Sequence, residues 1–404
     1  MKNLKEKIKA YGLKNAVEHE GKAVEGAIIS ALFHEGLKRE EVKEVIKDVK
    51  AEVSRINKLS AEQQKKEYEK FEEDISKRKE RVGLPELPDT EKVIMRFRPA
   101  PSGPMHIGHI ITGLPSSLYA KKYKGKFYII VDDTDPETAL KEAYDNIKRD
   151  CDWIFGNVHE YINSSDRMLR YYEIAVELIK KQKAYVCTCA QKKFKIYSER
   201  MKDCPCRNFS VKDNLERWGV MLKKSKEGDA VLRFKSDMKH PNPAMRDFPL
   251  ARISLKEHVK QGKKYRVWPL MNLVVAIDDM DMNMTHVIRG KEHRDNAERQ
   301  KLIFEAFDKK FPWTFFMGRI KFEDLVISKR KITAMINAGD IENEEDARIP
   351  TIASIRKRGY LPEAFAMMAE HRGLTEVDKV MKSEDFFRLL DNFNKEAVEE
   401  AKKR

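Results

Sequence analysis

The sequence predicts an α/β fold in which a parallel sheet forms the main body and a separate helical segment precedes it. Two short apolar runs, at residues 93–97 and 127–131, have the length and composition of buried strands. Residues 107–122 between them are long enough for a crossover helix, so the two strands should be parallel neighbours. Ligands of such sheets bind beyond the carboxyl ends of the strands, so candidate site residues are expected there.

The composition fits a protein of several domains without membrane spans. The chain has 404 residues, enough for two to four domains, and 41% of them are hydrophobic. No apolar run approaches the roughly 18 residues of a transmembrane helix. The first residues, MKNLKEKIK, lack the apolar core of a signal peptide. We therefore expect a cytoplasmic protein with no membrane partner.

The net charge of +14 indicates a polyanionic partner. Acidic and basic residues nearly balance up to residue 90, so almost all of the excess positive charge lies in the main body. A lysine-rich composition can also reflect no more than a solvated surface. The charge alone leaves nucleic-acid binding and ordinary solubility equally open.

Residues 1–88 are predicted to form a helical N-terminal extension. Apolar residues with the 3-4 spacing of an amphipathic helix run through its middle, at Val42, Val45, Ile46, Val49, Val53 and Ile56. Two prolines in the stretch LPELP, residues 84–88, then interrupt any helix, because proline lacks a donor and restricts the residue before it. We place a domain boundary there and expect no chemistry from the extension.

A loop rich in glycine and histidine follows the first predicted strand and leads into the predicted helix. Gly103 and Gly108 allow the backbone to approach a ligand closely, and a helix N-terminus favours bound negative charge. His106 and His109 can project on one side and donate to phosphate oxygens. Metal ligation and helix capping fit an HxxH pair about as well. The position at a strand–loop–helix junction favours the phosphate interpretation.

The second predicted strand ends in an acidic cluster, DDTDP at residues 132–136. Such clusters bind Mg²⁺, bind an amino group or cap a helix. Asp135, directly before a proline, is assigned the capping role. Asp132 and Asp133 are kept as candidates for ligand contact.

The cysteines form a pattern of their own. Two CxC pairs separated by 14 residues suit a tetrahedral zinc site, with the ligands Cys187, Cys189, Cys204 and Cys206. Structural disulfides are not expected in a cytosolic chain. The alternatives are a relic of a metal site, or two pairs too distant to converge. Cys151, in an apolar helical context, is expected to be an ordinary core residue.

Together these motifs resemble the signatures of a known enzyme family. The string RFRPAPSGPMHIGH, residues 96–109, resembles the HIGH signature of class I aminoacyl-tRNA synthetases. Its flanks and the DDTDP stretch resemble the glutamyl/glutaminyl subgroup, and VISKRK at residues 326–331 resembles the second signature, the KMSKS loop. The likeness covers about residues 90–395 and is closest to glutamyl-tRNA synthetases of the archaeal and eukaryotic type.

The resemblance implies a two-step acyl transfer that uses ATP, glutamate and tRNA(Glu), with tRNA(Gln) left open, and Mg²⁺ on the phosphates. The α-carboxylate of glutamate would attack the α-phosphorus of ATP, release pyrophosphate and leave glutamyl-adenylate. The terminal adenosine hydroxyl of tRNA would then take the glutamyl group. No enzyme nucleophile is needed, so positioning and a field of cations around the developing phosphate charge should supply the catalysis.

The resemblance also implies the site residues. The catalytic residues would be His106, His109 and Lys329. Glutamate would be bound by Arg96, Asp132, Met271, Val275 and Arg289. ATP would be bound by Gly103, His106, Gly108, His109, Gly290, Glu292, Ser328 and Lys329. The two arginines would pair with carboxylates and Asp132 with the ammonium group, unless the arginines are held in structural ion pairs.

Several positions depart from the family pattern. Ile130 stands where arginine is usual, and Val326 replaces the first lysine of the second motif. Small and polar residues of the first motif are replaced by Arg98 and Ala100. Met271 and Val275 make one wall of the expected pocket apolar.

The resemblance divides the main body into four predicted parts. Residues 89–186 and 265–331 would be the halves of a Rossmann-type catalytic domain, residues 187–264 an inserted acceptor-binding domain with the cysteine pairs, and residues 332–404 a helical domain. Within the second half, residues 265–279 would be a substrate-pocket strand and residues 285–293 the next strand and turn.

Residues 332–404 show no pattern of the β-barrels with which relatives read the anticodon. A truncated chain, a separate anticodon-binding polypeptide and a protein that works without barrels all stay open. The competing functions are a glutaminyl-tRNA synthetase, a tRNA-modifying glutamyl transferase and a split synthetase subunit that only binds tRNA.

Overall fold

The computed structural model describes residues 4–19, 21–71, 83–325 and 328–403. The chain divides into two compact units, Met1–Glu80 and Arg81–Arg404. Within the described ranges, no helix is both long and apolar enough to cross a bilayer.

The N-terminal unit consists of helices around a core of its own. Its α-helices are α1 (Leu4–Glu18), α2 (Glu25–His34), α3 (Val42–Ile56) and α4 (Ala61–Tyr68). The predicted amphipathic helix is α3, in which Val45, Val49 and Ile56 are buried. The prediction of helices in this region is confirmed.

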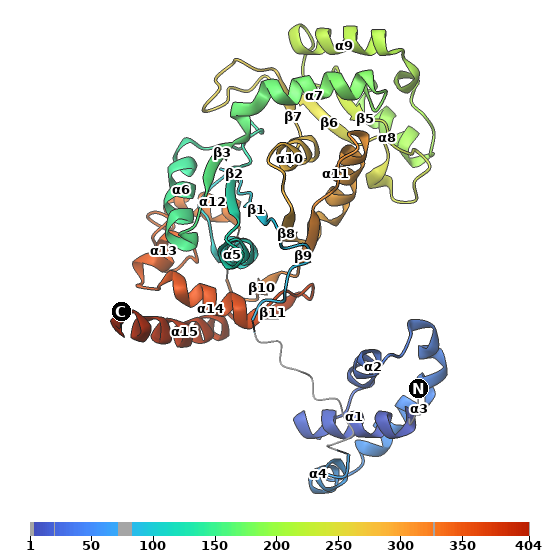
Figure 1. Ribbon diagram of the computed structural model, residues 1–404, viewed down its shortest axis with the longest axis vertical. Helices are drawn as coiled ribbons and strands as arrows, with labels where there is room; N and C mark the ends of the chain where they lie inside the picture. Colours follow the sequence, from blue (N-terminus) through green and yellow to red (C-terminus); the bar gives the residue numbers. More distant parts are fainter. Residues whose placement is uncertain (1–3, 20, 72–82, 326–327, 404) are drawn as a thin grey trace. The chain divides into compact units, whose positions relative to one another are not determined.

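A parallel sheet lies at the centre of the larger unit (Figure 1). Strands β1 (Ile94–Phe97), β2 (Lys126–Val131) and β3 (Glu160–Asn163) pair in that order, and β8 (His286–Gly290) and β9 (Trp313–Met317) form a two-stranded parallel sheet that extends this arrangement. The pair lies next to β1, because Thr285 N donates to Ile94 O over 3.0 Å. The predicted parallel neighbours are β1 and β2, so this prediction is confirmed.

Helices connect those parallel strands that pair directly with each other. They are α5 (Ile107–Lys122) between β1 and β2, α6 (Lys141–Phe155) between β2 and β3, and α11 (Arg294–Ala306) between β8 and β9. A parallel connection must return to the end of the sheet where it began, and a helix covers that distance while burying one face of the sheet. The loops before α5 and α6 therefore lie at the carboxyl edge, as the sequence predicts.

An antiparallel sheet is inserted between the two parts of the parallel sheet. Its strands are β4 (Ala184–Cys187), β5 (Val231–Phe234), β6 (Pro249–Ile253) and β7 (Val267–Pro269), paired in that order. The helices of this region are α7 (Met168–Lys180), α8 (Gln191–Glu199) and α9 (Val211–Lys223). Trp268 of β7 is fully buried in the core beside it.

The expected strand over residues 265–279 is wrong for most of its length. Only Val267–Pro269 is a strand, and Met271–Asp281 is helix α10. The run from Leu273 to Ile277 is buried on all sides, and a short apolar run without periodicity does not distinguish a buried helix from a buried strand. The next strand and turn, at residues 285–293, are found as β8 and the short 3-10 helix after it.

The C-terminal part packs against α5. Its elements are β10 (Ile320–Phe322), α12 (Lys329–Ala338), α13 (Ile352–Lys357), α14 (Pro362–Arg372), β11 (Lys379–Met381) and α15 (Ser383–Lys403). α14 contacts both α5 and α15, and β11 pairs with β10 in parallel (Figure 1). Two backbone hydrogen bonds join this part to the histidine loop, from Ile107 N to Pro350 O and from Ile352 N to Met105 O.

Candidate active site

A cavity of about 710 Å³ opens at the carboxyl edge of the parallel sheet. Among the predicted site residues, its walls contain Arg96, His106, Gly108, His109, Asp132, Met271, Val275, Arg289, Gly290, Glu292 and Lys329. Gly103 and Ser328 are not part of the lining, although each is adjacent in sequence to a residue that is, Ser102 and Lys329 respectively. Val326 and Ile327 of the second motif lie outside the described residues. The cavity thus brings together two motifs that are far apart in the sequence.

Gly103 sets the distance between those two motifs. Its φ of +139° favours glycine, and a Cβ at this position would lie 2.8 Å from Thr333 Oγ1 of α12. Lys329, the first residue of α12, reaches across the same contact, and its Nζ donates to Ala100 O at 2.6 Å. The close approach that the sequence assigned to a ligand is made here by α12.

The two histidines cap α5 through their Nδ1 atoms. His106 is the N-cap residue, and its Nδ1 accepts a hydrogen bond from Gly108 N at 3.2 Å. His109 Nδ1 accepts from His106 N at 3.1 Å. The capping alternative is therefore realised. It also places the proton of each neutral ring on Nε2, because Nδ1 acts as an acceptor. Each ring keeps one donor that capping does not use.

Burial makes both imidazoles neutral at pH 7. Burial, together with the positive charge of Lys329, lowers the pKa of His106 to about 4. Burial also lowers the pKa of His109 well below its usual value, and His106 and Lys329 add to this effect. The pKa of Lys329 falls to about 8, again because of burial. The expected field of three cations is thus one ammonium group and two neutral N–H donors.

Arg96 is held in a bidentate ion pair. Its Nε donates to Asp279 Oδ1 at 2.5 Å and its Nη2 to Asp279 Oδ2 at 2.8 Å, and both side chains are buried. This is the structural ion pair that the sequence left as an alternative. The charge of Arg96 is compensated by the protein itself.

Arg98, which the sequence marked only as a departure from the family, is also compensated. Its Nη1 donates to Asp278 Oδ2 at 2.8 Å, and its Nη2 lies 3.6 Å from Asp132 Oδ1. Asp278 is fully buried and accepts further hydrogen bonds from Arg167 and Tyr171. Arg96 and Arg98, which both line the cavity, therefore have carboxylate partners.

Arg289 has no such partner among the described residues. Its Nη1 donates to the neutral amide oxygen of Gln300, Oε1, at 2.7 Å, and its buried Nε has no hydrogen-bond partner in the described part of the chain. Burial and repulsion from Arg96 lower the pKa of Arg289 to about 9, and the carboxylates of Asp279 and Glu292 offset only part of this effect. Partial desolvation of a cation without a carboxylate in direct contact costs free energy, which a bound carboxylate would offset.

The acidic cluster divides its residues between the cavity and the protein interior. Asp132 lines the cavity. Asp133 is buried away from it, where its carboxylate accepts from Ser165 N, at 2.7 Å, and from Tyr144 OH, at 2.8 Å. Asp133 as a candidate for ligand contact is therefore wrong, because its oxygens are already satisfied.

The capping role assigned to Asp135 is wrong as well. Helix α6 begins only at Lys141, with Leu140 as its N-cap residue. The Asp135 carboxylate accepts from Glu137 N at 3.2 Å within a turn and pairs with Arg252 at 3.0 Å. The proline after Asp135 starts this turn rather than the helix.

Helix α10 and the loop after β8 complete the cavity. Met271 and Val275 are one helical turn apart on α10 and present an apolar wall, as the sequence predicts. On the other side, a Cβ at Gly290 would lie 2.5 Å from Glu292 Oε1. Glycine at this position therefore allows the Glu292 carboxylate to fold back over the backbone.

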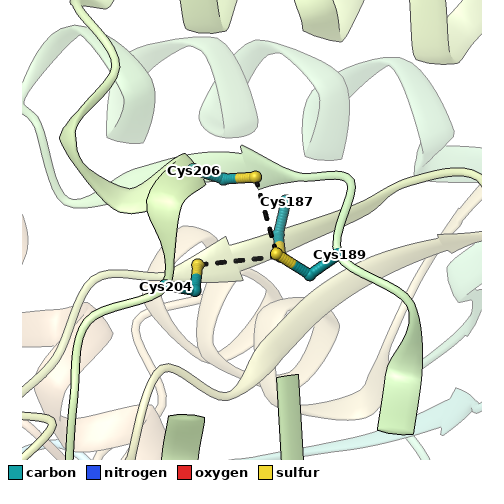
Figure 2. Close-up of side chains that lie close together, drawn as sticks. All are labelled: Cys187, Cys189, Cys204 and Cys206. Atoms are coloured by element: carbon teal, nitrogen blue, oxygen red, sulfur yellow. Dashed lines mark hydrogen bonds between the residues drawn. The ribbon is translucent and has the colours of Figure 1, made fainter. Parts of the chain in front are cut away.

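The four cysteines of the CxC pairs converge in the inserted region (Figure 2). Their sulfur atoms all lie within 4.8 Å of one another. The Sγ–Sγ distance is 3.9 Å from Cys187 to Cys204 and 3.8 Å from Cys189 to Cys206. The alternative that the two pairs are too distant to converge is excluded. Cys151 is fully buried in the core against the parallel sheet, as expected.

Comparison with known proteins identifies the family. Residues 92–398 match the family of class I tRNA synthetases (E and Q), catalytic domain. The chain is 38% identical over 403 residues to the glutamate–tRNA ligase of Methanocaldococcus jannaschii, covering 99% of this chain and 72% of that protein. It is 42% identical over 381 residues to the glutamate–tRNA ligase of Pyrococcus furiosus, covering 91% of this chain and 67% of that protein.

A solved structure supports the fold. A glutamate tRNA ligase from Elizabethkingia meningosepticum, in complex with its amino acid, superposes with a TM-score of 0.53 at 20% identity, covering 76% of this chain and 70% of that one. At this identity the likeness concerns the fold alone. The extent of the family match and the identity to the archaeal relatives place the chain in the glutamate and glutamine group of the class I aminoacyl-tRNA synthetases.

Proposed function

We propose that this protein is a glutamate–tRNA ligase, which activates glutamate with ATP and transfers it to the 3′ end of tRNA(Glu). The observation that carries the choice of amino acid is Arg289, a partly buried cation without a carboxylate in ion-pair contact among the described residues, in the wall of the cavity. A carboxylate side chain neutralises this cation, whereas the amide of glutamine does not.

The amino-acid subsite combines Arg289 with an acid and an apolar wall. Arg289 binds the side-chain carboxylate of glutamate, and the carboxylate of Asp132 binds its ammonium group. Met271 and Val275 contact the methylene groups of the substrate. Arg96, whose charge Asp279 already compensates, contributes only a weaker dipolar contact.

The nucleotide subsite is formed by the two motifs. His106, His109 and Lys329 line the cavity, and we assign the phosphates to their Nε2–H and ammonium donors, with Gly108, Gly290 and Glu292 around the nucleotide. Neutral N–H donors that are already fixed by capping need no reorganisation when negative charge develops on the α-phosphate. Mg²⁺, which is expected for this class of enzyme, supplies further neutralisation of the phosphate charge when bound.

We further propose that the four cysteines hold a structural zinc ion. Tetrahedral coordination with Zn–S bonds of about 2.3 Å places the sulfur atoms about 3.8 Å apart. The Sγ–Sγ distances of 3.8 and 3.9 Å fit that geometry. Four cysteine ligands leave no open position, so the ion stabilises the inserted region and takes no part in the reaction.

The glutaminyl alternative is tested by aminoacylation. Purified protein is incubated with ATP, total tRNA and either glutamate or glutamine, and the esterified amino acid and the tRNA are identified by mass spectrometry. We expect glutamate on tRNA(Glu), and the same samples show whether tRNA(Gln) also receives glutamate. Glutamine as the esterified amino acid contradicts the proposal. No charging with either amino acid, in a folded protein, favours a subunit that only binds tRNA.

A further inference from the structure

Arg96, Arg98 and Arg289, three of the arginines that line the cavity, differ in how the protein treats their charge. Asp279 compensates Arg96 through two hydrogen bonds, and Asp278 compensates Arg98. Arg289, on β8, has only the side-chain amide of Gln300 as a partner among the described residues. Because of this contrast, the function of Arg289 depends on its partner, Gln300, as well as on the arginine itself.

Gln300 is fixed in one orientation. It lies on α11 and is almost fully buried, at 1% exposure. Its Oε1 accepts from Arg289 Nη1 at 2.7 Å, and its Nε2 donates to Asn272 Oδ1, on α10, at 3.3 Å. Because Asn272 takes the donor end of the amide, the acceptor end must face the guanidinium group.

A neutral hydrogen-bond acceptor orients a guanidinium group without neutralising its positive charge. A carboxylate in the same place would form an ion pair like that of Arg96 and Asp279, and the full charge would no longer be available to a ligand. An apolar residue would leave the charge but not the orientation. The amide of Gln300 is the partner that preserves both.

We propose that Gln300 is a positioning residue that sets the charge selectivity of the amino-acid subsite, by orienting Arg289 while leaving its charge unpaired for the substrate carboxylate. This inference rests on the proposed function, in which Arg289 binds the side chain of glutamate. Asn272 acts one step further away, by fixing the amide of Gln300.

Two variants separate charge from orientation. Gln300→Glu keeps the size and introduces a carboxylate, and Gln300→Met keeps the length and removes the hydrogen bond without adding charge. Both are compared with the wild type as full chains. The measurements are ATP–pyrophosphate exchange with glutamate and with glutamine, in the presence of tRNA, together with glutamate binding by calorimetry and thermal melting.

In Gln300→Glu, we expect kcat/KM for glutamate to fall by about 100-fold or more, because the introduced carboxylate forms an ion pair with Arg289 and competes with the substrate carboxylate. The preference for glutamate over glutamine should collapse, while the melting temperature stays the same or rises. In Gln300→Met, we expect a rise in KM for glutamate of about 10-fold, with the preference retained, because one hydrogen bond to a charged group is lost.

Other results overturn the positioning role. Equal losses in the two variants, or glutamate activity in Gln300→Glu within about threefold of the wild type, show that charge at this position does not control selectivity. A large fall in the melting temperature of both variants shows a structural role instead. If these results accompany a wild type that activates glutamate, the proposed function stands. A wild type that neither binds nor activates glutamate overturns the proposed function and this inference together.

Discussion

The cavity and the cysteine cluster bring reactive side chains together in opposite ways. In the cavity, Arg289 keeps a buried Nε without a partner among the described residues, and the two histidines keep their Nε2 donors. In the cluster, the sulfur atoms face one another within 4.8 Å, and three of the four cysteines are buried (Figure 2). An open site with unsatisfied groups suits ligands that come and go, whereas a closed site suits a permanent ion. Substitutions should therefore lower activity at the first and stability at the second.

The largest effect is expected from the cluster. Cys206→Ser removes one of four ligands, so the zinc should be lost and the free energy of unfolding of the inserted region should fall by on the order of 5 kcal/mol. Elemental analysis and thermal melting measure the two effects. Cys151→Ala is the matched control, because Cys151 lies outside the cluster and this variant should keep its zinc. A metal-free wild-type protein that melts at the same temperature as the zinc-loaded protein would contradict the assignment.

The next effect concerns the cavity. His109→Ala removes a fixed donor to the developing phosphate charge, so the rate of glutamate-dependent pyrophosphate exchange should fall by about 10²–10³-fold. The melting temperature should fall far less than in Cys206→Ser, because the cavity variant should lose activity whereas the cluster variant should lose stability. Unchanged exchange in a folded His109→Ala protein would remove His109 from the catalytic residues.

The pH dependence of activity should follow Lys329 rather than the histidines. The ammonium form of Lys329 predominates below its pKa of about 8, so kcat/KM for ATP should decline as the pH rises through that value. The pKa of His106 is about 4, so its ring stays neutral from pH 8 down to pH 5 and no loss is expected near the usual histidine pKa of 6.5. A profile that falls between pH 7 and pH 6, in proportion to histidine protonation, would show that one of the two rings titrates in the free enzyme.

The smallest effect distinguishes the two neighbouring acids of the cluster after β2. Tyr144→Phe deletes the hydrogen bond to Asp133 Oδ2, which should lower the free energy of unfolding by about 1 kcal/mol. Because Asp133 does not line the cavity, KM for glutamate should not change. Asp132→Asn, in contrast, should raise this KM, since Asp132 lies in the wall. Equal KM values for glutamate in the two variants would contradict the claim that Asp132 contacts the substrate and Asp133 does not.

The sequence predicted what is local. The strands β1 and β2, helix α5 between them and the amphipathic α3 follow from apolar periodicity and from chain length between strands. The convergence of the cysteines was also predictable, because two close pairs need only one contact between them to form a four-ligand site. Resemblance then supplied the residues of the cavity wall.

The sequence could not predict which partner each arginine takes. Asp279 follows Arg96 by 183 positions, and Gln300 is an unremarkable polar residue on a helix. Only the tertiary placement of α10, which carries Asp279, and of α11, which carries Gln300, decides that one arginine meets a carboxylate and the other an amide. The same holds for Asp132 and Asp133, where the turn after β2 sends one carboxylate to the cavity and the other to Ser165 and Tyr144.

The most direct test of the account is the amino-acid selectivity of the wild-type protein. ATP–pyrophosphate exchange, with tRNA present, is measured over a range of concentrations of glutamate and of glutamine. If the unpaired charge of Arg289 selects the substrate, kcat/KM for glutamate should exceed that for glutamine by about 10²-fold or more. Equal values, or a preference for glutamine, would contradict the claim that this cavity recognises a carboxylate side chain.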